Sequence, residues 1–365
     1  MMPRDIFNAI RKKVRSGARL HREDGLALFE TDDIFTLGEL ANIVRERKNG
    51  KRAYYIRNIH VNPSNICVNR CGFCAFSRSK GEAGAFELTA RDIIKNIKKA
   101  WPVSEVHIVG GLHPDWPFEH YLKMLSSIKR AFPFLHIKAF TATEVDYFSK
   151  LSGLSLGDVL AELKKNGLGS MPGGGAEIFA HGVRERLCPE KLTGQGWLEV
   201  MAEAHRAGIK TNATMLYGHI ETYEDRVDHL LMLRELQDMA LKSKSAKRGN
   251  FQAFIPLTYH PKSTAIGGSG SSGLDDLKTM AVSRLVLDNF IHIKAYWVML
   301  GEKLSQLSLL FGADDLDGTV IDEKITYSAG GQSRRSITGG ELVNLIKKAG
   351  MRPVERDSFY RPVKR

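Results

Sequence analysis

Three closely spaced cysteines form the strongest chemical pattern in this chain. Cys67, Cys71 and Cys74 follow the spacing C-x₃-C-x₂-C. Such crowding does not suit a disulfide framework, whereas thiolates are the ligands that iron–sulfur clusters and zinc use. A four-iron cluster ordinarily takes four thiolates, so three would leave one iron open to a substrate. The spacing therefore predicts a [4Fe–4S] cluster with one open coordination position.

A zinc site completed by a histidine, such as His113, is the alternative for the same cysteines. Structural zinc favours two separate pairs of ligands, and this spacing does not provide them. The fourth cysteine, Cys188, stands alone before a proline. We therefore expect Cys188 to be structural and expect no second cluster.

The elements that must position these ligands follow an alternating pattern from about residue 55 onward. Amphipathic helical stripes separate short apolar runs that predict strands. These runs cover residues 106–109, 135–140, 209–216, 251–257 and 291–297. Repeated strand–loop–helix units imply parallel strands joined by right-handed crossovers. The expected fold is an α/β fold, a (β/α) barrel of TIM type that is either full or partial.

Three segments are expected along the chain. Residues 1–52 form a helical N-terminal cap, residues 53–310 form the barrel core, and residues 311–365 form a C-terminal extension that completes the barrel. The Gly/Ser-rich stretch at 266–273 is predicted to be a flexible loop, because the strand–helix alternation resumes directly after it.

The cysteine motif resembles that of the radical S-adenosylmethionine (SAM) superfamily. In that superfamily the amino and carboxylate groups of SAM chelate the open iron. The resemblance implies that Phe73 lies near the adenine of SAM. It also implies that the GGLHP motif, with Gly110, Gly111 and His113, holds the methionine amino group at a strand end, where glycines let the backbone approach a ligand. A simple strand–helix turn would use the same glycines.

Two acidic residues are further candidates for contacts with SAM. Glu144, at the end of another expected strand, could accept hydrogen bonds from SAM, or it could only stabilise a helix N-terminus. Glu177 follows three glycines in the segment SMPGGGAEIF. Within the same segment, Gly174 and Gly175 are candidates for substrate binding, because they could form a nest of N–H groups that binds a carboxylate, or simply a tight loop.

Other polar residues lie near the ends of expected strands and are candidates for substrate binding. They could bind substrate carboxylates or steer a proton, although single residues of this kind are more often structural. They are His60, Arg78, Glu221, His260 and Lys294. Glu221, within the GHIET segment, has helix capping as its alternative role.

Composition excludes several classes of protein. Hydrophobic residues make up 43% of the chain and charged residues 26%, as in globular proteins with a real core. No apolar run is long enough for a membrane helix or a secretory signal, so we expect a cytoplasmic protein without a membrane partner. The net charge is +12, but the basic residues are scattered and no nucleic-acid-binding module is present. The charge indicates a solvated basic surface, and attraction for an anionic small substrate is the alternative.

Five motifs taken together resemble the aminofutalosine synthases, radical SAM enzymes of the futalosine route to menaquinone. The motifs are NICVNRCGFCAFSR, VGGLHP, KAFTATE, SMPGGGAEIF and GHIET. The resemblance extends over most of the chain and is most specific in KAFTATE and SMPGGGAEIF. The sister families, dehypoxanthine futalosine cyclase and the deazaflavin-precursor synthase, share the architecture and remain the alternative.

The resemblance implies a transferase that consumes SAM as a co-substrate. The 5′-deoxyadenosyl radical of SAM would add to 3-[(1-carboxyvinyl)oxy]benzoate, with loss of a carboxyl group. The products would be 6-amino-6-deoxyfutalosine and methionine. The implied partners are this enolpyruvyl benzoate and a one-electron donor such as flavodoxin or ferredoxin.

Overall fold

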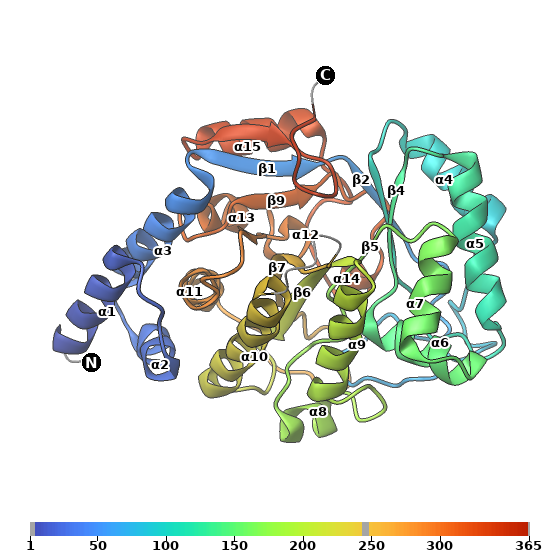
Figure 1. The fold of residues 1–365 in the computed structure, drawn as a ribbon, viewed down its shortest axis with the longest axis horizontal. Helices are drawn as coiled ribbons and strands as arrows, with labels where there is room; N and C mark the ends of the chain where they lie inside the picture. Colours follow the sequence, from blue (N-terminus) through green and yellow to red (C-terminus); the bar gives the residue numbers. More distant parts are fainter. Residues whose placement is uncertain (1–3, 243–247, 364–365) are drawn as a thin grey trace.

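A curled sheet of seven parallel strands lies at the centre of the molecule (Figure 1). The computed structural model describes residues 4–242 and 248–363. The order of strands in the sheet is β2-β3-β4-β5-β6-β7-β8, and a second parallel sheet has the order β10-β1-β9. The strands are β1 (Arg52–Ile56), β2 (Asn58–Val61), β3 (Glu105–Ile108), β4 (His136–Ala139), β5 (Ser170–Met171), β6 (Lys210–Tyr217), β7 (Phe251–Thr258), β8 (His292–Ile293), β9 (Asp315–Gly318) and β10 (Arg352–Glu355).

Between the strands, and before the first of them, the chain forms helices. They are α1 (Arg4–Ser16), α2 (Arg22–Glu30), α3 (Ile34–Asn49), α4 (Ala90–Ala100), α5 (Phe118–Ala131), α6 (Ala142–Ser152), α7 (Leu156–Lys165), α8 (His181–Leu187), α9 (Gly194–Arg206), α10 (Tyr223–Lys242), α11 (Gly273–Val286), α12 (Trp297–Leu300), α13 (Glu302–Ser308), α14 (Ile325–Ser328) and α15 (Gly339–Lys348). The prediction of a TIM-type (β/α) barrel is confirmed in its partial form, with a helical N-terminal cap.

The C-terminal part of the chain lies against both edges of the seven-stranded sheet. Isolated parallel bridges join Lys294, just after β8, to Asp315, and Ile59 of β2 to Ile321. At the N-terminal ends of the strands, the ring of Phe359 meets His136 edge-on, with 4.9 Å between ring centroids. The C-terminal tail therefore covers one end of the barrel and leaves the other end for the strand-end loops.

The N-terminal cap consists of α1, α2 and α3, which extend to one side of the barrel (Figure 1). Helix α3 packs its apolar residues against α11, and Gly38 is needed there because a Cβ atom would lie 2.8 Å from the ring of Phe311. The guanidinium of Arg19 forms ion pairs with Asp238 and Asp288. These contacts fix the cap to the helical layer outside the barrel.

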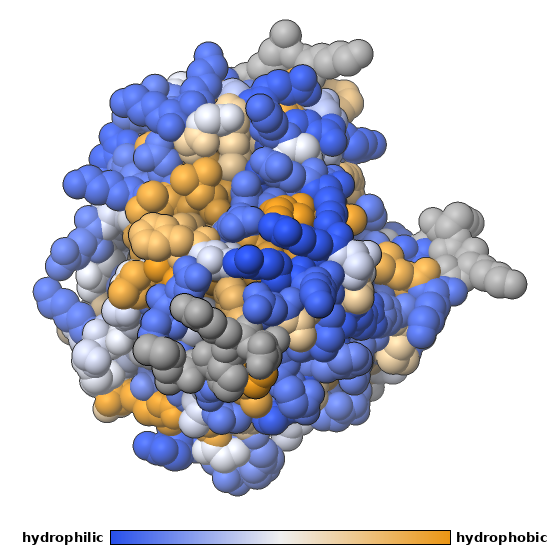
Figure 2. All heavy atoms as spheres, turned by 90° about the vertical axis from the view of Figure 1, so that its left-hand side faces the viewer, coloured by the Kyte–Doolittle hydropathy of each residue, from blue (hydrophilic) through white to orange (hydrophobic). Residues whose placement is uncertain are grey.

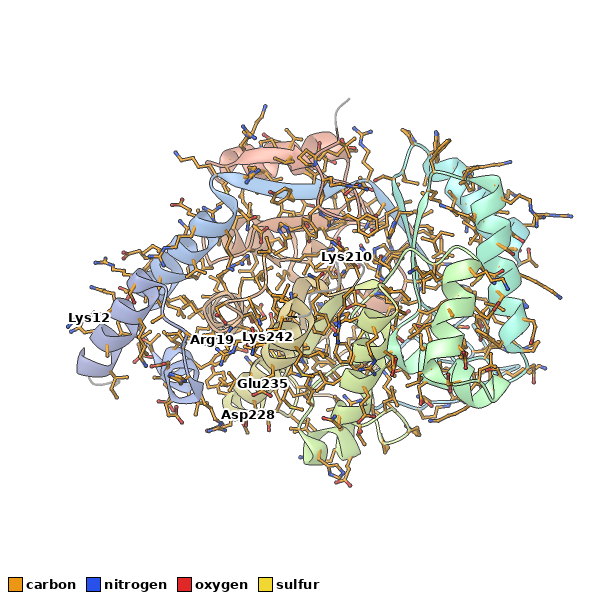
Figure 3. All side chains as sticks on the ribbon, in the orientation of Figure 1. Lys12, Arg19, Lys210, Asp228, Glu235 and Lys242 are labelled. Atoms are coloured by element: carbon orange, nitrogen blue, oxygen red, sulfur yellow. The ribbon has the colours of Figure 1, made fainter. Side chains whose placement is uncertain are left out.

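The surface is mostly polar. Figure 2 shows the face that carries the N-terminal helices, on which hydrophilic residues surround separate hydrophobic areas. Charged side chains such as that of Lys12 on α1 point away from the body of the molecule (Figure 3). Within the described part of the chain, no helix has the length and apolar content needed to span a membrane.

Candidate functional site

A cavity of about 320 Å³ opens at the C-terminal ends of the barrel strands. Its walls follow the alternation of strands, in which every second residue points inward. His60 of β2, His107 of β3, and Asn212 and Thr214 of β6 line it for this reason. The predicted site residues that line this cavity are Cys67, Cys71, Cys74, Phe73, Gly110, Glu144, Gly174, Gly175, Glu177, His60, His260 and Lys294.

The three cysteines lie on a loop that backbone hydrogen bonds hold on both sides. The N–H of Cys67 donates to the carbonyl of Arg78 over 3.1 Å, and the N–H of Gly72 donates to the carbonyl of Leu187 over 2.9 Å. This loop follows β2, which ends at Val61. The wrapped loop turns all three thiols toward the same cavity.

The cysteines fit a cluster better than a single metal ion. Among residues 4–242 and 248–363, no three His, Cys, Asp or Glu side chains surround one point as a mononuclear site requires. A cluster needs a different arrangement, since each thiolate binds a separate iron. Burial raises the pKa of Cys71 to about 12. Metal binding would therefore have to release that proton.

The GGLHP motif closes β3 beside the cysteine loop. The N–H of Gly111 donates to the carbonyl of Ser64 over 2.8 Å. A Cβ atom on Gly111 would lie 2.7 Å from the carbonyl carbon of Ile66, so only glycine fits there. Gly110 lines the cavity, whereas Gly111 supports the cysteine loop from outside the cavity.

Glu144 combines a helix-capping role with a place in the cavity wall. It is the third residue of α6 in a capping box with Thr141, and its carboxylate accepts a hydrogen bond from the N–H of Thr141 over 2.7 Å. A second hydrogen bond comes from the N–H of Gly110 over 3.3 Å. Burial raises the pKa of Glu144 to about 7, although these hydrogen bonds act in the opposite direction. A cationic group that binds nearby would lower the pKa of this carboxyl group and favour its ionised form.

Acidification is expected to stabilise the cluster-free protein through Glu144. The folded pKa of about 7 exceeds the ordinary value of 4.5, so the folded state holds the proton more tightly. The contribution of Glu144 to the free energy of unfolding is complete below pH 4.5 and disappears as the pH rises through 7. Between these two pH values it changes by about 3 kcal/mol. Urea unfolding of the wild type and of Glu144→Gln at several pH values measures this difference. Parallel pH profiles of the two proteins would contradict the prediction.

Lys191 is a half-buried cation in the cavity wall that the sequence did not reveal. Its Nζ lies 2.5 Å from Oε1 of Glu177 and 4.8 Å from the centroid of the Phe73 ring. Burial opposes the charge on Lys191, but nearby Cys71 and Glu177 outweigh burial and raise the pKa of the ammonium. Lys191 therefore joins the cysteine loop to the glycine-rich segment that contains Glu177.

Removing Lys191 should destabilise the protein strongly. Lys191→Met leaves the Glu177 carboxylate buried without its partner, a change that costs about 3–5 kcal/mol. The double variant Lys191→Met/Glu177→Gln should lose less, because no uncompensated charge remains. Lys165→Met, at an exposed ion pair with Glu162, is the control and should change the free energy of unfolding by at most about 0.5 kcal/mol. Urea unfolding of the cluster-free proteins gives these values, and equal losses for the single and double variants would refute the argument.

The glycine-rich segment lines the cavity with Gly174 and Gly175. No described residue accepts a hydrogen bond from the N–H of Gly174 or Gly175. The segment's carbonyl groups are used instead: Trp197 donates to Gly174 over 3.2 Å, and Arg184 donates to Ala176 over 2.6 Å. Such an arrangement leaves N–H donors available to an anionic ligand.

Four predicted site residues lie outside the cavity wall: Gly111, His113, Arg78 and Glu221. His113 stacks on Trp116 and its Nε2 lies 2.5 Å from Oε1 of Glu87, so it contacts a surface carboxylate rather than the cysteines. The guanidinium of Arg78 donates to the carbonyl groups of Ala75 and Ser77. Of these two side chains, only that of Arg78 bonds the segment that follows the cysteines.

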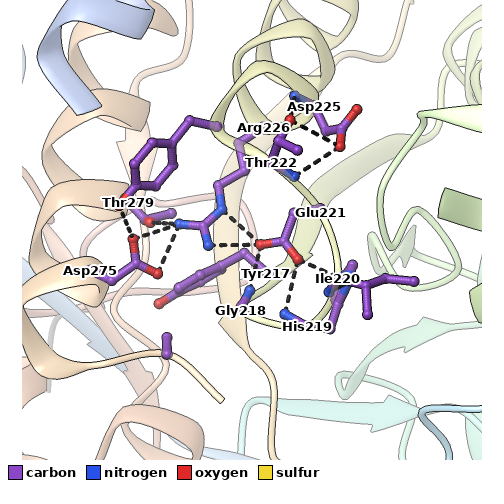
Figure 4. A network of polar contacts seen from close by, with 12 residues as sticks. Tyr217, Gly218, His219, Ile220, Glu221, Thr222, Asp225, Arg226, Asp275 and Thr279 are labelled. Carbon is purple, nitrogen blue, oxygen red and sulfur yellow. Dashed lines mark hydrogen bonds and ion pairs between the residues drawn. The ribbon is translucent and has the colours of Figure 1, made fainter. Parts of the chain in front are cut away.

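Glu221 belongs to a buried network behind the cavity (Figure 4). Its carboxylate accepts hydrogen bonds from the N–H groups of Gly218 and His219 and forms an ion pair with Arg226 at 2.7 Å. Burial disfavours the charged form, but His219 and Arg226 lower the pKa of Glu221 to about 2. Arg226 also pairs with Asp275 of α11 at 2.8 Å. Glu221 thus fixes the loop between β6 and α10.

The deep end of the cavity holds charged and polar residues that were not predicted. The cavity-lining residues missed there are His107, Lys138, Asn212 and Asp317. Strand alternation could have indicated His107 and Lys138, because both occupy inward positions of predicted strands. Asp317 gave no such signal, since its strand was not predicted.

The chain matches two family models. Residues 61–233 match the radical SAM superfamily, and residues 248–365 match the CofH/MqnC C-terminal region. The two models together cover the barrel and the C-terminal part of the chain.

Similar curated proteins cover nearly the whole chain. An aminodeoxyfutalosine synthase of Thermus thermophilus is 45% identical over 97% of this chain and 95% of its own length. That of Streptomyces coelicolor is 43% identical over 98% of this chain and 94% of its own length. A 5-amino-6-(D-ribitylamino)uracil–L-tyrosine 4-hydroxyphenyl transferase of Methanococcoides burtonii is 39% identical over 94% of this chain and 96% of its own length.

Solved structures share the fold at low sequence identity. Methylornithine synthase has a TM-score of 0.72 at 19% identity, and the match covers 94% of this chain and 97% of that chain. The FeFe-hydrogenase maturase HydG of Carboxydothermus hydrogenoformans has a TM-score of 0.73 at 18% identity, over 98% of this chain and 81% of that one. Members of the matched superfamily use a [4Fe–4S] cluster and SAM. The chain therefore belongs to the radical SAM superfamily of enzymes.

Proposed function

We propose that this enzyme is an aminofutalosine synthase of menaquinone biosynthesis. It transfers the 5′-deoxyadenosyl group of SAM to 3-[(1-carboxyvinyl)oxy]benzoate, with loss of a carboxyl group, and produces 6-amino-6-deoxyfutalosine and methionine. The observation that carries this proposal is the near-full-length identity of 45% and 43% to two aminodeoxyfutalosine synthases. The identity to the methanogen tyrosine transferase is lower, at 39%.

In this proposal Cys67, Cys71 and Cys74 hold the cluster at the mouth of the barrel. When bound, the cluster supplies the electron that breaks the bond between the sulfonium of SAM and its 5′ carbon. The free N–H groups of Gly174 and Gly175 suit the carboxylate of SAM, and Glu144 suits an amino or ribose hydroxyl group. These roles agree with the places of all three residues in the same cavity wall.

The proposed acceptor fits the remaining space. One side of the cavity is apolar, with Leu216 of β6 and with Ile255 and Leu257 of β7. An aromatic ring can pack on such a wall and be held away from water, close to the group that attacks it. The acceptor is dianionic, and the net charge of +12 favours its approach.

A second candidate is the transfer of a 4-hydroxyphenyl group from tyrosine to 5-amino-6-(D-ribitylamino)uracil. The similarity to the methanogen transferase over 94% of this chain supports it. Both candidates need SAM and the cluster, but they differ in the group that is transferred and in its acceptor.

The decisive experiment is an anaerobic assay of the reconstituted protein with dithionite, SAM and each acceptor in parallel. Mass spectrometry should detect an adenosyl adduct that has lost a carboxyl group, together with stoichiometric methionine, only with the enolpyruvyl benzoate. A product only with tyrosine and the ribitylaminouracil would replace the proposal by the second candidate. Replacing dithionite by flavodoxin or ferredoxin tests the proposed electron donors.

A further inference from the structure

The deep end of the cavity carries four nitrogen-bearing side chains from neighbouring strands. His60 of β2, His107 of β3 and Lys138 of β4 are direct partners across the strands, and Lys294 follows β8. All four line the cavity, and we call them the cavity floor. The cysteines lie at the opposite end, on the loop after β2.

A carboxylate partly compensates the positive charge of each lysine of the floor. Nζ of Lys138 lies 2.8 Å from Oε1 of Glu105, and Nζ of Lys294 lies 2.9 Å from Oδ1 of Asp317. An ammonium group has three N–H donors, and each of these bonds uses one. The remaining donors are available to a group that enters the cavity.

One ring nitrogen of each histidine of the floor has no hydrogen-bond partner among the described residues. Nε2 of His60 and Nε2 of His107 are buried, and no described residue forms a hydrogen bond with either atom. Their rings lie 4.5 Å apart. Burial lowers the pKa of His60 to about 4 and that of His107 well below its ordinary value, so both rings are neutral and each carries one N–H. Buried polar atoms without partners are costly, which points to a ligand that completes them.

We propose that the cavity floor binds the aryl carboxylate of the acceptor through His60, His107, Lys138 and Lys294. This inference rests on the proposed function and names which end of the acceptor enters first. The vinyl ether must lie close to SAM, and therefore near the cysteines. The aryl carboxylate is then at the far end of the molecule, with the ring against the wall formed by Leu216, Ile255 and Leu257.

The hypothesis that these histidines are purely structural predicts a different effect on stability. If the histidines only filled the barrel, replacing one would lower the melting temperature and change ligand binding without regard to charge. If the two histidines bind a carboxylate of the ligand, His107→Leu removes a polar atom that has no partner in the ligand-free protein. The melting temperature of this variant should then be unchanged or higher. The same substitution should weaken binding of aryl carboxylates specifically.

The test compares 3-hydroxybenzoate with its neutral analogue 3-hydroxybenzamide, by calorimetry on the cluster-loaded enzyme. The wild type should bind the carboxylate at least about tenfold more tightly than the amide, because hydrogen bonds to charged groups are the stronger kind. His107→Leu and His60→Leu should each remove most of this preference. Equal affinities of the wild type for the two probes would overturn the proposal, whether or not either variant folds.

His205→Leu is the matched control. His205 is fully buried and its Nε2 lies 2.9 Å from Oγ1 of Thr211, but it does not line the cavity. This variant should lose thermal stability and keep the preference for the carboxylate. Loss of that preference in His205→Leu would show that general damage, rather than the floor, explains the effect.

Steady-state kinetics separate this inference from the proposed function. With the enolpyruvyl benzoate, His107→Leu should raise KM about 10- to 100-fold and change kcat much less, because the contact is made equally in the ground and transition states. Turnover with an unchanged KM would refute the binding role of the cavity floor but leave the proposed function intact. A preference for the carboxylate probe without any turnover of this acceptor would refute the proposed function but leave the binding role of the floor intact.

Discussion

Cys71→Ser is expected to eliminate the cluster and every trace of SAM cleavage. Serine oxygen is a poor ligand for iron in place of a thiolate, and only three cysteines of this loop are available to hold the cluster. Cys71 is buried and faces the same cavity as Cys67 and Cys74. The reconstituted variant should lack the brown iron–sulfur absorption and release no methionine from SAM under dithionite.

Cys188→Ser is the matched control for this variant. Cys188 is also buried, and its neighbour Leu187 accepts a hydrogen bond from the N–H of Gly72 in the cysteine loop. Because Cys188 does not line the cavity, the cluster and SAM cleavage should persist. Cluster loss in Cys188→Ser, or SAM cleavage by Cys71→Ser, would contradict the assignment of the ligands.

Gly111→Ala should have the second largest effect, although this residue lies outside the cavity. The new methyl group would collide with the backbone carbonyl of Ile66, directly before Cys67. Neither backbone can yield easily, because the N–H of Gly111 is bonded to Ser64 at the same point. We expect a loss of about 3 kcal/mol or more in the free energy of unfolding, and a low iron content after reconstitution.

Gly157→Ala provides the control for adding a methyl group. Gly157 lies in α7, and a Cβ atom there would meet nothing closer than 3.8 Å. Alanine is the better helix former, so this variant should gain about 0.5–1 kcal/mol and keep its iron. Iron analysis and urea unfolding of both variants test the argument, and a fully loaded Gly111→Ala enzyme would refute it.

Two carboxylates show why the candidate site could be predicted only in part. Glu144 and Glu221 both lie just after a strand and near the start of a helix, so their local patterns are alike. In the structure Arg226 pairs with Glu221 and keeps it charged behind the cavity. Glu144 accepts hydrogen bonds from the backbone N–H groups of Thr141 and Gly110 and lines the cavity, where burial raises its pKa to about 7. The difference comes from Arg226 on α10, which lies only five residues after Glu221 and forms a buried ion pair with it that the sequence interpretation did not predict.

The residues missed by the sequence interpretation have the same explanation. Lys191 lies in a loop between α8 and α9 and reaches the cavity through its contacts with Glu177 and Phe73. Lys138 pairs with Glu105 of the neighbouring strand. Nothing near Lys191 in the sequence distinguishes it from the many basic residues of the surface, whereas the alternation of its strand could have indicated Lys138.

By itself, the sequence predicted the three cysteines as cluster ligands, the parallel α/β class and the end of the barrel where the motifs meet. Cluster ligands that share one loop are visible as spacing, and the inward side of a strand is visible as alternation. The tertiary structure decided which polar residues meet: it gathered His60, His107, Lys138 and Lys294 at the cavity floor and assigned Glu221 to a structural network. The physical reason is that burial and partner charges depend on residues far apart in the chain, and these set the role of each ionisable group.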